Sequence, residues 1–143
     1  MTLSQLEDFF ADFPDTITEL ASVEFGDEAE ILNRQNSRIK YPVMWVETPT
    51  VTFTHEPAGV QYAFPISFLA NVPRGAGAEE RAARSAMLVL AQRAWARLVA
   101  GEAEGLFQFV RNEEEGDAIL KYSGDNDTGW RFVARLVVGR DDC

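Results

Sequence analysis

The longest regular alternation of apolar and polar positions lies between residues 60 and 72. Every second residue there is apolar, and the residues between them are mostly polar or small. The apolar row consists of Val60, Tyr62, Phe64, Ile66, Phe68, Ala70 and Val72. This alternation predicts a strand with one buried face, and at about 3.3 Å per residue it spans roughly 40 Å. We expect Pro65 to mark a bulge or an edge position, because proline cannot donate a hydrogen bond to a sheet.

Residues 79–100 carry the strongest helical pattern, and Gly101 is the expected end of that helix. One apolar stripe consists of Ala83, Met87, Leu90, Ala94 and Leu98, and an adjoining stripe consists of Leu88, Ala91, Trp95 and Val99. Together they cover about half of the circumference, which is wider than the roughly 100° that packing on one sheet requires. We expect the N-terminal helix or another subunit to cover the excess.

The remaining elements are shorter. Residues 2–13 predict a helix that Thr2 or Ser4 caps and Pro14 ends. Strands are expected at 17–25, 39–47, 50–54, 107–111, 118–122 and 130–138, and a loop or a brief helical turn at 26–38. In the last strand Arg131 and Arg135 are expected to face outward. The inward row is Trp130, Phe132, Ala134, Leu136 and Val138.

This order of elements predicts an α+β fold: an antiparallel or mixed β-sheet with one long helix and a short N-terminal helix packed on one face. The 143 residues fit a single domain, 1–143. The overlong strand and the segment before it predict a hairpin arm, around residues 50–72, that projects from the sheet.

The net charge of −10 is distributed unevenly. Residues 1–30 hold nine acids and no Lys or Arg, whereas Arg81, Arg84, Arg93 and Arg97 lie on the long helix. An acidic surface repels phosphate backbones, so we do not expect the chain to grip nucleic acid. The acids keep the protein soluble or, alternatively, support contacts between copies. We expect no secretory signal, no membrane-spanning segment and no internal disulfide, since Cys143 is the only cysteine.

Each candidate for chemistry has a simpler structural interpretation. His55 has no nucleophile or metal-ligand partner in the pattern, and Cys143 has no neighbour that lowers its pKa. Gly75 and Gly77 lack the spacing of a phosphate loop. Residues 125–129 (DNDTG) resemble the start of a calcium loop, but a hairpin turn explains them as well. We therefore expect no catalytic residue, no cofactor and no metal site; cation binding by the acidic loops stays open.

The layout resembles the tail-terminator and tail-completion proteins of tailed bacteriophages and contractile injection systems. The stretches 40–47 (KYPVMWVE) and 129–133 (GWRFV) are similar to segments of such proteins. The resemblance implies a virion structural protein without enzymatic activity, assembled in the host cytoplasm. It implies a ring, commonly hexameric, that contacts tail-tube and neck proteins and through whose lumen DNA passes.

A ring needs contacts between two different surfaces of each copy. We expect the oligomer interface to include residues of the long helix and of the long strand: Arg81, Arg84, Leu88, Trp95, Tyr62, Phe64 and Phe68. The main alternative function is a small acidic adaptor, or a domain similar to a secretion chaperone, that binds an extended peptide as a dimer. A small enzyme with scattered Asp, Glu, Tyr and Arg residues is a third.

Overall fold

A computed structural model describes residues 1–27, 39–55, 58–72, 77–110, 116–122 and 127–139. Two long antiparallel strands, β4 (Ala58–Asn71) and β7 (Asp127–Gly139), form the centre of the sheet. Their register runs from Gly59↔Gly139 to Asn71↔Asp127 without a shift. The alternation at residues 60–72 therefore predicted the central strand of the fold.

Five shorter strands flank this pair and complete a seven-stranded sheet. Beside β4 lie β2 (Val43–Val46) and β3 (Thr50–His55), and β1 (Ser22–Phe25) pairs with the outer edge of β2. Beside β7 lie β5 (Gln108–Phe109) and β6 (Asp117–Tyr122). The β1–β2 pair is parallel and the other pairs are antiparallel, so the sheet is mixed, as predicted.

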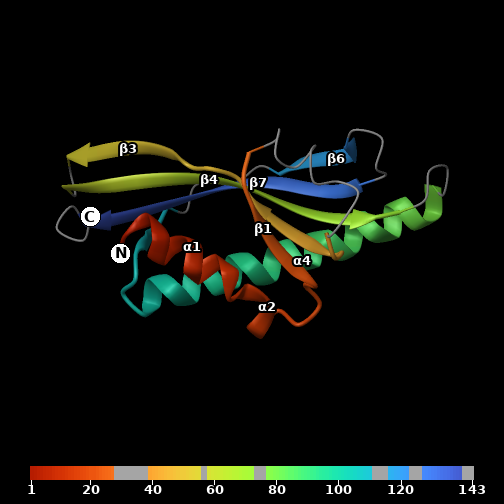
Figure 1. The fold of residues 1–143 in the computed structure, drawn as a ribbon, viewed down its shortest axis with the longest axis horizontal. Coiled ribbons are helices and arrows are strands. Elements are labelled where there is room, and N and C mark those ends of the chain that lie inside the picture. The colour runs from red at the N-terminus through yellow and green to blue at the C-terminus, as the bar shows by residue number, and fades with distance from the viewer. Residues whose placement is uncertain (28–38, 56–57, 73–76, 111–115, 123–126, 140–143) are drawn as a thin grey trace.

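In the part of the chain that the structure describes, three helices lie on one face of this sheet (Figure 1): α1 (Leu3–Ala11), α2 (Phe13–Thr16) and α4 (Gly77–Ala103). A capping box starts α1, because the Thr2 hydroxyl accepts from the Gln5 amide at 3.3 Å and the Gln5 side chain accepts from the Thr2 amide at 2.8 Å. The prediction that Pro14 ends the first helix is wrong: α1 already ends at Ala11, and Pro14 lies in the first turn of the short α2, where its missing N–H costs no hydrogen bond. The predicted α+β class, with helices on one face, is confirmed.

The core lies between the helices and the sheet. It contains the apolar row of β4 from Val60 to Phe68, the inward residues Ala134, Leu136 and Val138 of β7, and aromatic residues of the N-terminal helices. Phe10 packs on Phe64 with ring centroids 5.0 Å apart. On the opposite face, Val43 and Leu69 form a smaller apolar cluster with Ile39 and Tyr41. Both faces of β2 are thereby buried.

A bulge separates β2 from β3, which lie end to end along β4. Residues 47–49 lie opposite only two residues of β4, 64–65. The Glu47 amide donates to the Pro65 carbonyl at 2.9 Å, so the backbone of Pro65 faces the bulge. The N–H that proline lacks is not needed at this position for pairing in the sheet. The register with β7 continues through Pro65↔Val133. Pro65 thus marks a bulge, as predicted, but the extra residue belongs to the opposite strand.

Because the bulge adds one residue, it changes which side chains face the helices. In β2 the even-numbered Met44 and Val46 face the core. In β3 the odd-numbered Val51 and Phe53 lie on this same face of the sheet, because their partners in β4, Tyr62 and Val60, face the core. The β3–β4 hairpin extends past α1 at one end of the molecule (Figure 1), and β7 pairs with its β4 strand over the whole length.

The prediction that Gly101 ends the long helix is wrong, because α4 continues to Ala103. Gly101 is buried inside the helix, where an added Cβ would lie 2.7 Å from the Phe107 ring and 3.0 Å from the Phe9 ring. Glycine is there for close packing. The chain instead leaves the helix at Gly105, whose φ of 79° is a left-handed conformation that favours glycine.

Several predictions fall outside the described residues: most of the segment 26–38, Gly75, residues 125–126 of the DNDTG stretch, and Cys143. Thr128 and Gly129, from the end of that stretch, belong to β7.

Candidate functional site

The strand residues predicted for an oligomer interface lie in the core of the chain itself. Tyr62 is 8% exposed, Phe64 1% and Phe68 0%. Their rings pack on aromatic neighbours of the same chain: Phe64 on Phe10, and Phe68 on Trp95 with centroids 6.5 Å apart. A buried ring cannot contact a second copy, so these three residues do not belong to the proposed interface.

The helix residues predicted for the interface lie at or near the surface of α4. Arg81 is exposed, and Leu88 is 37% exposed. Arg84 is half-buried: its guanidinium donates to the Thr128 hydroxyl at 3.4 Å, and its carbonyl accepts from the Trp130 indole at 2.8 Å. These two bonds attach the first half of α4 to β7.

The outward face of α4 is unusually poor in charge. Between residues 82 and 103, eleven residues are exposed, and Arg93 is the only charged one among them. The apolar members are Ala82, Ala86, Leu88, Val89, Ala96, Val99, Ala100 and Ala103. We call this surface the α4 face. A helix on the surface of a globular protein normally has a polar outward face, and a helix that is apolar on all sides is normally buried.

Arg93 is neutralised within the chain, since it forms a salt bridge with Glu19. The hydrogen bond from Arg93 lowers the pKa of Glu19 below its usual value. Both side chains are half exposed, so this pair contributes little to stability. Its main effect is that the α4 face carries no isolated charge that a contact would desolvate.

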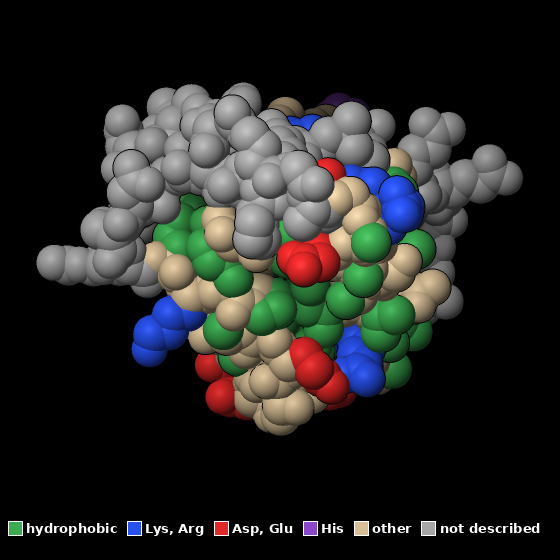
Figure 2. All heavy atoms as spheres, turned by 90° about the vertical axis from the view of Figure 1, so that its right-hand side faces the viewer, with side chains coloured by type: hydrophobic (Ala, Val, Ile, Leu, Met, Phe, Trp, Pro, Cys, Tyr) green, Lys and Arg blue, Asp and Glu red, His purple; other side chains and the backbone are tan. Residues whose placement is uncertain are grey.

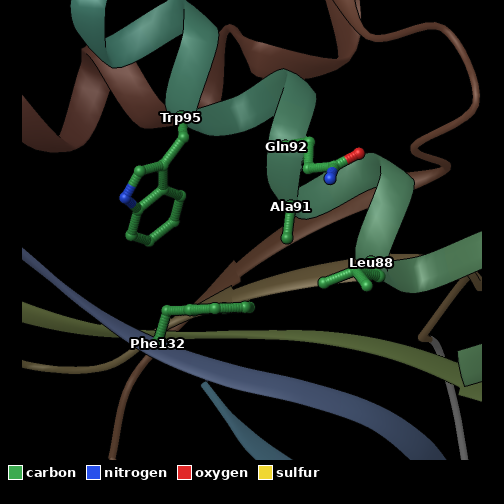
Figure 3. A pocket seen from close by; sticks show the side chains of 5 residues that line it. All are labelled: Leu88, Ala91, Gln92, Trp95 and Phe132. Atoms are coloured by element: carbon green, nitrogen blue, oxygen red, sulfur yellow. The ribbon is translucent and has the colours of Figure 1, made fainter. Parts of the chain in front are cut away.

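A hollow adjoins the α4 face between α4 and β7 (Figure 3). Its volume is about 210 Å³, and its lining residues are Leu88, Ala91, Gln92, Trp95 and Phe132. We call it the Trp95 pocket. The Trp95 and Phe132 rings lie 5.3 Å apart at 54°, and Gln92 is the only lining residue with a polar side chain apart from the indole. On the other side of α4 a groove of about 340 Å³ includes Pro42, Val89 and Leu90.

Figure 2 shows the molecule from the end where α4 begins. Hydrophobic side chains gather in the middle of this view, between separate acidic and basic groups. The large hydrophobic residues of α4 that are exposed are Leu88, Val89 at 46% and Val99 at 38%.

Strand β3 forms a second exposed apolar surface, which the sequence analysis did not identify. Val51 is 49% exposed and Phe53 is 67% exposed, the highest value among the large hydrophobic residues that the structure describes. The strand contains no Asp, Glu, Lys or Arg. We call Val51 and Phe53 the β3 knob. Strands at the edge of a sheet normally carry charged residues or proline, which discourage contact with other chains.

Among the described residues, no group of three or more His, Cys, Asp and Glu side chains is placed to hold a metal ion. In the same part of the chain, no helix has the length and apolar character that crossing a membrane requires.

No protein-family model matches the chain, and no curated protein sequence matches it. Inference about function therefore rests on the fold and on the two exposed apolar surfaces, the α4 face with its pocket and the β3 knob.

Proposed function

We propose that this protein is a structural subunit that assembles head to tail into a ring, in the manner of the phage tail-terminator and head–tail joining proteins that its sequence resembles. The observation that carries the proposal is the α4 face. Six turns of helix expose alanine, leucine and valine, with one charged side chain that is already paired. Burial in an assembly removes this apolar surface from water, at about 25 cal/mol per Å².

A ring, rather than a two-chain complex, is favoured by the presence of two unlike apolar surfaces. The hairpin that carries the β3 knob extends past α1 (Figure 1), whereas the Trp95 pocket is lined by residues from the middle of α4 and by Phe132 of β7. A contact between two different surfaces leaves one of each uncovered in every pair, so it adds further copies, and it forms a ring where the rotation between neighbouring copies closes. The acidic charge of −10 per chain suits a lumen through which DNA moves without binding.

The test is the mass and shape of the purified full chain, by native mass spectrometry and negative-stain electron microscopy. We expect closed rings, hexameric as in the proteins that the chain resembles. Val89→Asp introduces a charge into the α4 face and should leave the chain monomeric and folded. Ala11→Asp places the same charge at an exposed position on α1 and is the control. A wild-type chain that stays monomeric at high concentration contradicts the proposal.

The location in a phage tail needs a second test, because rings occur in many protein classes. Tail tubes assembled from the tail-tube protein encoded beside this chain should acquire a ring at one end when the wild-type protein is added. The Val89→Asp variant should leave the tube ends bare. Genes for tail-tube, sheath or portal proteins next to this one are expected, and a neighbouring gene for a secreted effector would argue against a tail.

The alternative function, a peptide-binding adaptor, is favoured by the groove beside Val89 and Leu90. Apolar grooves along a helix are typical sites for an amphipathic or extended peptide. An adaptor should form a stable dimer whose mass does not grow with concentration, and Val89→Asp should abolish peptide binding without changing that mass.

A further inference from the structure

The two exposed apolar surfaces differ in shape. The β3 knob is convex, because the aromatic ring of Phe53 protrudes with two thirds of its surface exposed. The Trp95 pocket is concave and lies between a helix and a strand (Figure 3). Unlike surfaces of complementary shape are what a head-to-tail contact requires.

The knob does not reach the pocket of its own chain. Phe53 pairs with Val60, and Phe132 at the floor of the pocket pairs with Ile66. These two positions are six residues apart along β4, which corresponds to roughly 20 Å. The pocket of one copy is therefore available only to the knob of another.

We propose that the side chain of Phe53 from one copy inserts into the Trp95 pocket of the next copy, and that this is the contact that closes the ring. The inference rests on the proposed function, and it names the two surfaces that meet. The partner is a second copy of this chain, with strand β3 as the inserted element.

The size of the pocket fits this occupant. A cavity of about 150 Å³ lined by apolar side chains binds benzene. The Trp95 pocket, at about 210 Å³, therefore has room for one phenyl ring and part of its methylene. Trp95 and Phe132 are tilted at 54° to each other, so a third ring can meet the edge of one and the face of the other.

The electrostatics of the two surfaces also agree. Neither the pocket nor β3 contains Asp, Glu, Lys or Arg. Two chains that each carry −10 repel at long range, and such chains make contact most easily where both surfaces are uncharged. The acidic residues Asp8 of α1, Asp15 of α2 and Asp12 between the two helices lie outside both surfaces.

The test uses two variants of the full chain, Phe53→Asp and Leu88→Asp. The first removes the knob and keeps the pocket, and the second places a charge in the pocket and keeps the knob. Each replaced side chain is at least one third exposed, so both variants should remain folded. Each alone should be monomeric, with a dissociation constant at least about 30-fold weaker than that of wild type, as for a hot-spot residue.

An equal mixture of the two variants is the decisive sample. The intact pocket of the Phe53→Asp chain accepts the intact knob of the Leu88→Asp chain, and the remaining knob and pocket are both blocked. The mixture should therefore form a two-chain complex with one copy of each variant and nothing larger. Thr52→Asp, on the opposite face of β3, is the matched control and should still form rings, because its side chain points away from the knob.

The possible failures can be told apart. If wild type forms rings and either single variant also does, this contact is wrong while the proposed ring stands. If both variants are monomeric but their mixture stays monomeric too, the knob and the pocket do not meet, and the contact is again wrong. If wild type itself never assembles, the proposed function and this contact fail together.

Discussion

Replacing Gly101 by alanine sets two opposing effects against each other inside α4. Alanine is favoured over glycine in a helix interior by about 1 kcal/mol. The new methyl would lie 2.7 Å from Cζ of Phe107 and 3.0 Å from Cζ of Phe9, closer than side chains normally approach. Both rings are buried and pack edge to face with centroids 5.4 Å apart, so neither moves freely.

Extra methyl groups in a packed core typically cost about 1–3 kcal/mol. Subtracting the gain in helix propensity, we expect Gly101→Ala to lower the free energy of unfolding by about 1 kcal/mol. For a chain of this size that corresponds to roughly 3 °C in Tm. Urea unfolding followed by far-UV circular dichroism measures the difference.

A double variant isolates the cause. Phe107→Leu shortens the side chain that blocks the methyl, so in that background Gly101→Ala should become stabilising by up to about 1 kcal/mol. Gly105→Ala is a matched control in the same region: nothing lies within 4 Å of its added Cβ, but its φ of 79° costs alanine about 1–2 kcal/mol. If Gly101→Ala is equally destabilising with and without Phe107→Leu, the Phe107 ring is not the reason for this glycine.

Three further predictions concern α4 and its neighbours. Leu98→Ala, at a fully buried position, should lower the free energy of unfolding in urea by about 2–5 kcal/mol. Val99→Ala, at an exposed position, should change it by less than about 0.5 kcal/mol, and equal changes would contradict the assigned faces of the helix. Arg93→Gln should raise the pKa of Glu19 toward its ordinary value, which an NMR titration measures. Because the pKa of Glu19 is lowered in the folded state, the pair stabilises the fold above the ordinary glutamate pKa, and this stabilisation is lost as the pH falls through the lowered pKa. An unchanged pKa of Glu19 in the variant would rule out Arg93 as the cause. Glu102→Ala should cost about 1.5–3 kcal/mol, because its carboxylate accepts from a backbone amide of β5 at 2.7 Å, and Glu102→Gln should recover part of that loss.

The sequence predicts the central layers of this fold well, because their patterns are long. Alternation over residues 60–72 identifies β4, and helical spacing over residues 79–100 identifies most of α4. The end of α4 is missed because glycine has two uses. Gly101 provides space for a neighbouring ring and Gly105 provides a left-handed turn, and composition alone does not distinguish them.

The candidate site is predicted less well, for a specific reason. Whether Phe53 faces the helices depends on one extra residue in the bulge at 47–49, which reverses the alternation between β2 and β3. The exposure of Phe53 depends further on how far α1 extends along the sheet, because the β3–β4 hairpin continues past this helix (Figure 1). By contrast, the core of the chain itself buries Tyr62, Phe64 and Phe68, although their aromatic character is also typical of an interface. Two signals in the sequence did point toward the proposed contact: the wide apolar arc on α4, which includes Leu88 and Trp95, and the predicted hairpin arm around residues 50–72, which includes Phe53.

The pairing of β4 with β7 affects how the chain folds as it is made. Partners in this pair are between 56 and 80 positions apart in the sequence, and the whole of α4 is synthesised between them. At about 5–20 residues per second, β7 follows β4 from the ribosome by roughly 3–14 s. During that interval one edge of the longest strand lacks its partner, and contacts so distant in sequence form slowly. A chaperone that holds nascent β4 should therefore raise the yield of folded protein more than one that acts on the finished chain.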